Sequence, residues 1–248
     1  MSDTTAYNQH FTPGRKPALE LLTNNPAGID TVFLAEDMHG LGDITSACKD
    51  RGVRFRKVKR AELDRMFHGN HQGVVTRLRE RTLIDLDQLI HQAHQAPFPL
   101  ILALDQVQDP GNAGTLARTL YSLGGAGLLF PRERTAFMGP AAAKAAAGTL
   151  DRLPLCQVVN LARALDHCVD AGMTVYGSGV GPESQTLFSA PMSFPAVLVL
   201  GNEEKGVRHG VRKRCDHILT IPMRGGFDSL NVAQAGAIIM GEMLRRLA

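Results

Sequence analysis

Three stretches of the sequence combine polar side chains with glycines, and each directly follows an apolar run. They are DQVQDPGNAGTLAR (105–118), LGNEEKG (200–206) and IPMRGGFDSLNV (221–232). Glycine lets a backbone bend around a small ligand while its amide groups stay free to bond that ligand. In the first stretch nearly two helical turns separate Asn112 from Arg118, so both side chains can face a common side near the start of a helix. Together these patterns predict a ligand site.

Each stretch also has an ordinary structural explanation. Asn112 suits the cap of one helix, and Ser229 and Asn231 suit the cap of another. Arg118, taken alone, fits a surface arginine. The glycine pair at 225–226 is different, because a simple strand-to-helix connection does not require it. That pair would let the third stretch fold back over a ligand.

The elements around these stretches predict an α/β fold. Apolar strands are expected at 100–105, 127–130, 155–159, 174–178, 196–201 and 217–222, with helices at 112–123, 141–148, 161–171 and 231–247. Apolar strands without strict alternation, separated by helices, indicate a mostly parallel sheet with helices on both faces. Ligands bind such sheets at the carboxyl ends of the strands, where all three stretches lie.

The chain changes character near residue 80, which predicts two domains. The earlier part has helical patterns at 16–22 and 44–51 and short strands at 31–35, 53–58 and 73–78. Residues 81–99 show helical periodicity and then two prolines, which favour an extended entry into the next strand. We therefore expect a small α/β domain at 1–80, a linker with a helix at 81–98 and the larger domain at 99–248.

Composition excludes several classes of protein. The chain has 248 residues, of which 44% are hydrophobic and 21% charged, as in an ordinary soluble protein. No apolar run approaches membrane-spanning length, and the first residues lack the pattern of a signal peptide, so we expect a cytoplasmic protein with no membrane partner. The four cysteines are scattered without metal-ligand spacing, which predicts free thiols and no metal centre.

Positive charge is concentrated in two segments. The formal net charge is only +3, yet residues 49–60 hold seven basic side chains against the single acid Asp50, and residues 208–214 hold four more. Either segment alone fits a solvated face, whereas two together favour a nucleic-acid partner. Within the first segment we expect Arg54, Arg56 and Lys59 to contact RNA phosphates.

Taken together, the three stretches resemble a known family. The motifs DQVQDPGNAGTLARTL, LGNEEKG and IPMRGGFDSLNV are similar, in order, to those of the SpoU (TrmH-like) branch of the SPOUT RNA methyltransferases. The segments GRKPALELL (14–22), TVFL (31–34) and HGNHQGVV (68–75) resemble the RNA-binding extension, itself similar to ribosomal protein L30e, of the ribosomal RNA ribose methyltransferases.

The resemblance implies S-adenosylmethionine-dependent methylation of a ribose 2′-hydroxyl in RNA, most closely a guanosine of 23S ribosomal RNA. It also implies a homodimer and a deep trefoil knot in the larger domain, a feature that general topology rules oppose. The cofactor would lie among the knotted loops and contact Gly201, Ile221, Met223 and Leu230.

The resemblance gives the polar residues of the motifs a catalytic role. Arg118 would hold the adjacent phosphate, orient the hydroxyl and offset developing negative charge, with proton removal by Arg118 or through the phosphate left open. Asn112, Ser229 and Asn231 would position the arginine, the ribose and the cofactor. Glu203 would order its loop or pair with a basic group rather than act as the base.

Three positions depart from the family pattern. Glu204 replaces a frequent glycine, and Ala146 and Ala233 replace common serines. None is assigned to chemistry, so the departures bear on substrate preference and loop geometry.

Other functions compete with the one that the resemblance implies. A transfer RNA methyltransferase or a non-enzymatic RNA assembly factor could use the same fold. A nucleotide-dependent oxidoreductase would need a GxGxxG turn, which the sequence lacks after any strand. The final helical pattern places Val232, Ala235, Ile239, Met243 and Leu247 in one stripe, which fits either a second subunit or packing within one chain.

Overall fold

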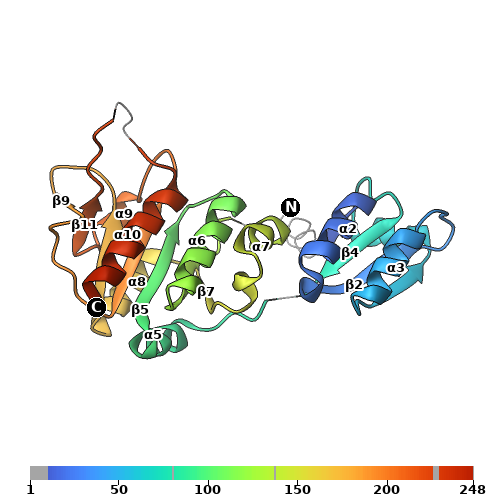
Figure 1. Ribbon diagram of the computed structural model, residues 1–248, viewed down its shortest axis with the longest axis horizontal. Coiled ribbons are helices and arrows are strands. Elements are labelled where there is room, and N and C mark those ends of the chain that lie inside the picture. Colours follow the sequence, from blue (N-terminus) through green and yellow to red (C-terminus); the bar gives the residue numbers. More distant parts are fainter. Residues whose placement is uncertain (1–10, 80, 137, 226–228, 248) are drawn as a thin grey trace. The chain divides into compact units, whose positions relative to one another are not determined.

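The computed structural model describes residues 11–79, 81–136, 138–225 and 229–247. The chain forms two compact units, one ending at Arg81 and the other beginning at Thr82 (Figure 1). No helix in the described ranges is long and apolar enough to cross a membrane.

The first unit is a four-stranded sheet with helices on both faces. Its strands are β1 (Phe11–Pro13), β2 (Ile29–Ala35), β3 (Phe55–Val58) and β4 (Val74–Leu78), and its helices are α2 (Arg15–Asn24), the short 3-10 turn η1 (Pro26–Gly28), α3 (Gly42–Asp50) and α4 (Arg60–Met66). The strand order is β1-β4-β2-β3, so β3 is an edge strand paired only with β2. Along β2, Val32 and Leu34 pack under α2 and α3, while Phe33 and Ala35 pack under α4.

The second unit contains a seven-stranded sheet in which every pair is parallel. Its strands are β5 (Phe98–Asp105), β6 (Gly125–Pro131), β7 (Leu155–Val158), β8 (Thr174–Ser178), β9 (Ser184–Thr186), β10 (Ala196–Gly201) and β11 (His217–Thr220). The order is β7-β6-β5-β10-β8-β11-β9. The predicted parallel sheet is confirmed. The trefoil knot stays a prediction.

Helices cover both faces of this sheet and create two separate apolar cores. They are α5 (Leu86–Gln95), α6 (Pro110–Ser122), α7 (Pro140–Ala146), η2 (Thr149–Asp151), α8 (Leu161–Asp170), α9 (His209–Arg212) and α10 (Val232–Leu247). Leu100, Leu102 and Leu104 of β5 join the core under α6, α7 and α10, whereas Ile101 and Ala103 join the core under α5 and α8. Helices α6 and α10 lie side by side on one face (Figure 1).

Helix α5 lies in the segment that the sequence predicted to be a linker, residues 81–98. Its residues Leu89, Ile90 and Ala93 are buried in the same core as Ile101 and Ala103 of β5. An Asp85–Gln88 capping box begins the helix. Residues from Thr82 onward therefore form part of the second unit.

Several short elements were absent from the sequence prediction. The strands β8 and β10 have the predicted bounds, but β1, β9, α4 and α9 were missed, since each is too short to show a periodic pattern.

The cysteines lie in the two units as free thiols, as expected. Burial raises the pKa of Cys48 and Cys156 to about 11 and that of Cys168 and Cys215 to about 12. These thiols are therefore structural groups rather than nucleophiles.

Candidate active site

A buried carboxylate fixes two of the three predicted loops to each other. Asp105, the last residue of β5, is fully buried, and Gly201, the last residue of β10, is its partner in the adjacent strand. The backbone N–H of Arg208 donates to Asp105 Oδ2 at 2.7 Å, and Arg208 Nε donates to Oδ1 at 2.7 Å. A second guanidinium nitrogen, Nη2, lies 2.6 Å from Oδ1. The loop after β10 is thereby fastened to the end of β5.

Helix α6 begins two residues earlier than the sequence predicted. Asp109, not Asn112, is its cap and accepts a 2.7 Å hydrogen bond from the Asn112 N–H. Pro110 occupies the first helical position, which suits its fixed φ, and proline also keeps the preceding residue extended. The prediction of Asn112 as the cap was wrong, and the consequence is that its side chain is free for other contacts.

The freed amide of Asn112 joins all three predicted loops. Its Nδ2 donates to Glu203 Oε1 at 3.0 Å, and its Oδ1 accepts from Asn231 Nδ2 at 3.0 Å. Asn231 Oδ1 in turn accepts from the N–H groups of Ala233 and Gln234 and so caps α10, as predicted. The starts of α6 and α10 and the loop after β10 are thus held by one chain of hydrogen bonds.

The loop after β10 is a tight turn. Asn202 and Gly206 exchange backbone hydrogen bonds of 3.0 and 2.9 Å, and Asn202 Oδ1 accepts from the N–H groups of Glu204 and Lys205. A Cβ at Gly201 would lie 2.1 Å from the backbone carbon of Gly206, so the turn itself requires glycine there. The positive φ of 66° falls on Gly206, which leaves Glu204 in ordinary backbone.

The third loop connects β11 to α10. Ile221 is half-buried against the core, whereas Met223 and Leu230 are 39% and 36% exposed. Ser229 is exposed and makes no hydrogen bond with the described part of the chain. Residues 226–228, which include the second glycine of the predicted pair, lie outside the described residues.

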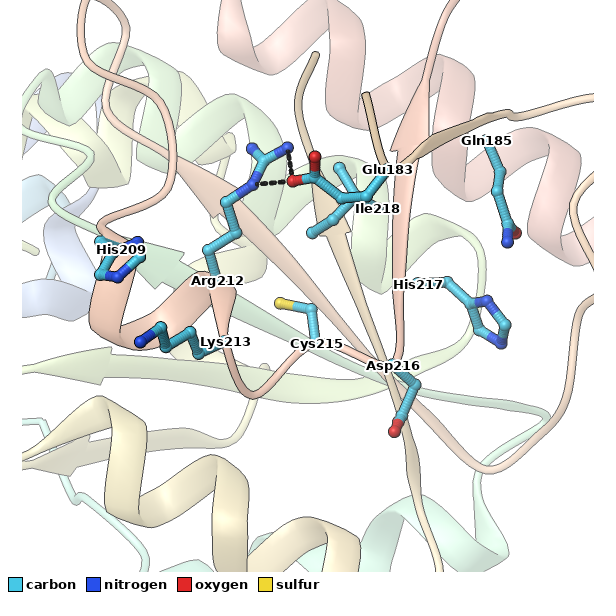
Figure 2. A pocket seen from close by; sticks show the side chains of 9 residues that line it. All are labelled: Glu183, Gln185, His209, Arg212, Lys213, Cys215, Asp216, His217 and Ile218. Carbon is cyan, nitrogen blue, oxygen red and sulfur yellow. Dashed lines mark hydrogen bonds and ion pairs between the residues drawn. The ribbon is translucent and has the colours of Figure 1, made fainter. Parts of the chain in front are cut away.

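A fourth loop, which the sequence analysis missed, lies between the second and third. Strand β8 is inserted between β10 and β11, so residues 178–183 emerge at the same edge of the sheet. Arg212 Nη2 donates to the Val180 carbonyl at 3.0 Å. Arg212 Nε donates to Glu183 Oε1 at 2.7 Å, as Figure 2 shows. A backbone hydrogen bond and then the Arg212 guanidinium lower the pKa of Glu183, which keeps the pair charged. The positioning of this loop depends on α9.

Arg118 stands apart from the hydrogen-bonded residues. It is exposed on α6 and makes no hydrogen bond or ion pair within the described ranges. Six residues of α-helix rotate a side chain by about 600°, which leaves Arg118 roughly 120° around the axis from Asn112. The two side chains therefore do not face a common side, and Arg118 is free to meet a molecule outside the chain.

The first basic segment lies on an edge. Every one of its basic side chains is exposed, and none forms a hydrogen bond or ion pair with the described residues; they are Lys49, Arg51, Arg54, Arg56, Lys57, Lys59 and Arg60. Four of them lie on or beside the edge strand β3. The arrangement leaves the segment open to a polyanion.

The second basic segment differs from the prediction of a phosphate-facing surface. Arg208, Arg212 and Arg214 pair with Asp105, Glu183 and Asp166, respectively. Its arginines mainly hold the loops of the site together. Across the described residues, no group of three or more His, Cys, Asp or Glu side chains could hold a metal ion.

Residues 99–241 match the SpoU rRNA Methylase family, and residues 13–83 match a family described as RNA 2'-O ribose methyltransferase substrate binding. An uncharacterized tRNA/rRNA methyltransferase of Mycobacterium avium is 35% identical over 94% of this chain and 76% of its own length. A putative TrmH family tRNA/rRNA methyltransferase of Bacillus subtilis, YacO, is 32% identical over 82% of each chain.

The fold of this chain is similar to that of a solved structure. The AdoMet-bound rRNA methyltransferase from Sinorhizobium meliloti aligns with a TM-score of 0.64 and 25% identity, covering 96% of this chain and 88% of that one.

Because Asp105 is buried, removing its partner Arg208 should destabilise the protein more than removing Arg214, which pairs at the surface. Arg208→Met should lower the free energy of unfolding by about 3–5 kcal/mol, because it leaves a buried carboxylate with one backbone donor. Arg214→Met is the matched control, since Arg214 and Asp166 are both partly exposed and should contribute less than about 1 kcal/mol. Urea denaturation measures both. Equal losses for the two variants would contradict this account of the loop.

Proposed function

The chain belongs to the SpoU rRNA methylase family, and from that premise we propose that this RNA methyltransferase methylates a ribose 2′-hydroxyl. Support comes from the first unit, most of which matches the substrate-binding family of RNA 2'-O ribose methyltransferases. The observation that carries the proposal is the chain of hydrogen bonds from Asn231 through Asn112 to Glu203. The helix that holds Asn112 also carries Arg118, which has no partner among the described residues.

S-adenosylmethionine is the cofactor that we assign to this site. The Sinorhizobium meliloti rRNA methyltransferase is described as AdoMet-bound. The residues fit this cofactor. The exposed side chains of Met223 and Leu230 would cover the adenine ring. Gly201 precedes a turn in which the backbone of Gly206 lies against it, so backbone groups are available to the cofactor. Half-buried Ile221 would complete this surface. When bound, the cofactor supplies a methyl group on a sulfonium, which is a good leaving group.

The residues of the chain would position and activate the hydroxyl. Methyl transfer forms a bond to the ribose oxygen, breaks the carbon–sulfur bond and releases the hydroxyl proton. Arg118 would hold the neighbouring phosphate and offset the negative charge that develops on the oxygen. With Arg118 charged, the proton leaves through the phosphate; transfer to Arg118 itself would require a neutral guanidine at the start of the step. Asn112 and Asn231 hold the loops in register, and Ser229 would bond the ribose or cofactor.

Glu203 is assigned a positioning role. Its two oxygens accept from Asn112 and Asn202, so its hydrogen bonds join the start of α6 to the turn after β10. A carboxylate engaged by two amides orders a loop rather than accepting the substrate proton.

The target that we favour is a guanosine of large-subunit ribosomal RNA, bound in part by the first unit. The exposed Arg54, Arg56 and Lys59 on and beside β3 would contact phosphates of a structured hairpin. The two relatives above are described as tRNA/rRNA methyltransferases, so transfer RNA is the alternative. Mapping ribose methylation in both RNA classes, from cells with and without the gene, separates them.

A homodimer is also proposed, although most of the predicted stripe along α10 is buried within the chain. Val232, Ile239 and Met243 are buried inside the chain, so packing within one subunit explains most of that stripe. Ile238 and Leu247 on the same helix remain 40% and 36% exposed. Nine residues of α-helix place these two side chains on opposite faces, so Ile238 is the side chain that we expect to contact the second copy.

Replacing Arg118 with alanine should remove methyl transfer without removing the cofactor. A preorganised charge stabiliser contributes roughly 10²–10³-fold, so single-turnover transfer should fall by about that factor. Calorimetric titration should give unchanged affinity for S-adenosylmethionine. Arg152→Ala, which removes another exposed arginine of the same unit, is the control. Wild-type rates for Arg118→Ala would show that the assigned mechanism is wrong.

Replacing Arg54, Arg56 and Lys59 with alanine should weaken RNA binding and flatten its salt dependence. Each lost phosphate contact lowers the log–log slope by about 0.7–0.9. Cofactor affinity and the rate at saturating RNA should persist, because the lost interaction is uniform binding. A control triple variant at the exposed Lys16, Arg65 and Arg152 should change the slope less. If both triple variants retain the wild-type slope, the basic segment is only a solvated face.

Sedimentation velocity at micromolar concentration should show a dimer. Ile238→Lys should shift the population toward monomer, because it places a charge in an apolar contact. Lys144→Ala, on the surface of α7, should leave the distribution unchanged. A wild-type protein that sediments only as a monomer would contradict the proposed assembly.

A further inference from the structure

A hollow opens at the carboxyl edge of the sheet, on the far side of β5 from β10. Its volume is about 190 Å³, and it is lined mainly by residues that follow three adjacent strands, with Arg208 added from the loop after β10. Gln106 follows β5, Glu133 and Arg134 follow β6, and Val159 and Asn160 follow β7. Ligands of parallel sheets bind at this edge.

The walls of this pocket are attached to the residues of the active site. The Gln106 carbonyl accepts a 3.1 Å hydrogen bond from Asn202 Nδ2, and Asn202 precedes Glu203. Arg208, which also lines the pocket, is the residue that binds Asp105. The pocket and the chain of hydrogen bonds around Asn112 therefore share the same two loops.

The loop that follows β6 is held at both ends. The Arg132 N–H donates to the Val158 carbonyl at 2.9 Å, and the Ala136 N–H donates to the Val107 carbonyl at 2.8 Å. Glu133 and Arg134 are thus presented by a fixed segment rather than by a free one.

The side chains in the pocket have unused binding capacity. Glu133 and Arg134 are exposed, and neither forms a hydrogen bond or ion pair with the described part of the chain. Val159 is 90% exposed, so its apolar side chain is open to a ligand in the pocket. Asn160 uses its Oδ1 to cap α8, which leaves its Nδ2 available.

The mixture of groups favours a base over a phosphate. A carboxylate such as Glu133 repels phosphate, whereas an unpaired base offers donors, acceptors and an apolar face. Guanine matches best, because its N1–H and N2 amino group can donate to Glu133 while O6 and N7 accept from Arg134. Val159 would contact the face of the ring.

We propose that this pocket binds an unpaired guanine of the RNA, next to the nucleotide that is methylated. This proposal rests on the function proposed above, and it assigns to Glu133 and Arg134 the recognition of a neighbouring base.

Variants of the exposed pocket residues test the assignment. Methyl transfer to total RNA from cells lacking the gene is measured for Glu133→Gln, Arg134→Ala and Arg152→Ala. Each pocket variant should lower kcat/KM for RNA about tenfold, the effect of one lost bidentate contact of about 1.4 kcal/mol, with unchanged cofactor affinity. Arg152 precedes β7 at the opposite edge of the sheet, so its variant should match wild type. If both pocket variants keep the kcat/KM of the wild-type protein, the proposal is overturned. Methyl transfer by the wild-type protein in the same assay would still support the methyltransferase function.

Competition by mononucleotides tests the base. GMP should inhibit methyl transfer more strongly than IMP, AMP or CMP, because IMP lacks the N2 amino group, and Glu133→Gln should remove the difference between GMP and IMP. Equal inhibition by all four nucleotides and by inorganic phosphate would overturn the proposal in favour of an anion site. A wild-type protein that transfers no methyl group to RNA would refute the proposed function instead.

Discussion

The burial of one carboxylate at the end of β5 governs the geometry of the whole site. An apolar strand that ends in a fully buried Asp105 is tolerable only if donors satisfy that charge, and Arg208 supplies them from the loop after β10. That contact fixes the turn carrying Glu203 against the segment that leads into α6. The amide chain from Glu203 through Asn112 to Asn231 joins the same two segments and extends them to the start of α10.

The same constraint separates residues that hold the site from residues that remain available to ligands. Arg208 and Arg212 are engaged with buried or loop carboxylates, although the sequence places them in a basic segment typical of nucleic-acid surfaces. Arg118, and the arginines and lysines of residues 49–60, lack such partners in the described part of the chain. Positive charge in this protein therefore has two uses that only the structure distinguishes.

Local patterns predicted most of the large elements, because apolar runs and helical periodicity are local properties. The convergence of three loops also followed, since carboxyl ends of parallel strands share one edge. Other features depended on distant pairing. The insertion of β8 between β10 and β11 brings residues 178–183 to the edge of the sheet where the site lies. The sequence of that short loop does not predict this position, because it depends on the order of the strands. The acid that ends LILALD was a usable signal for Asp105, but its partner lies 103 residues away.

Nucleoside analysis tests the central claim most directly. The full chain is incubated with S-adenosylmethionine carrying a labelled methyl group and with RNA from cells lacking the gene, and the RNA is then digested and separated by mass spectrometry. The account predicts that the label resides on the ribose, as a 2′-O-methylated nucleoside and foremost guanosine. Label on a base, or RNA that acquires no label while the protein binds the cofactor, would contradict it.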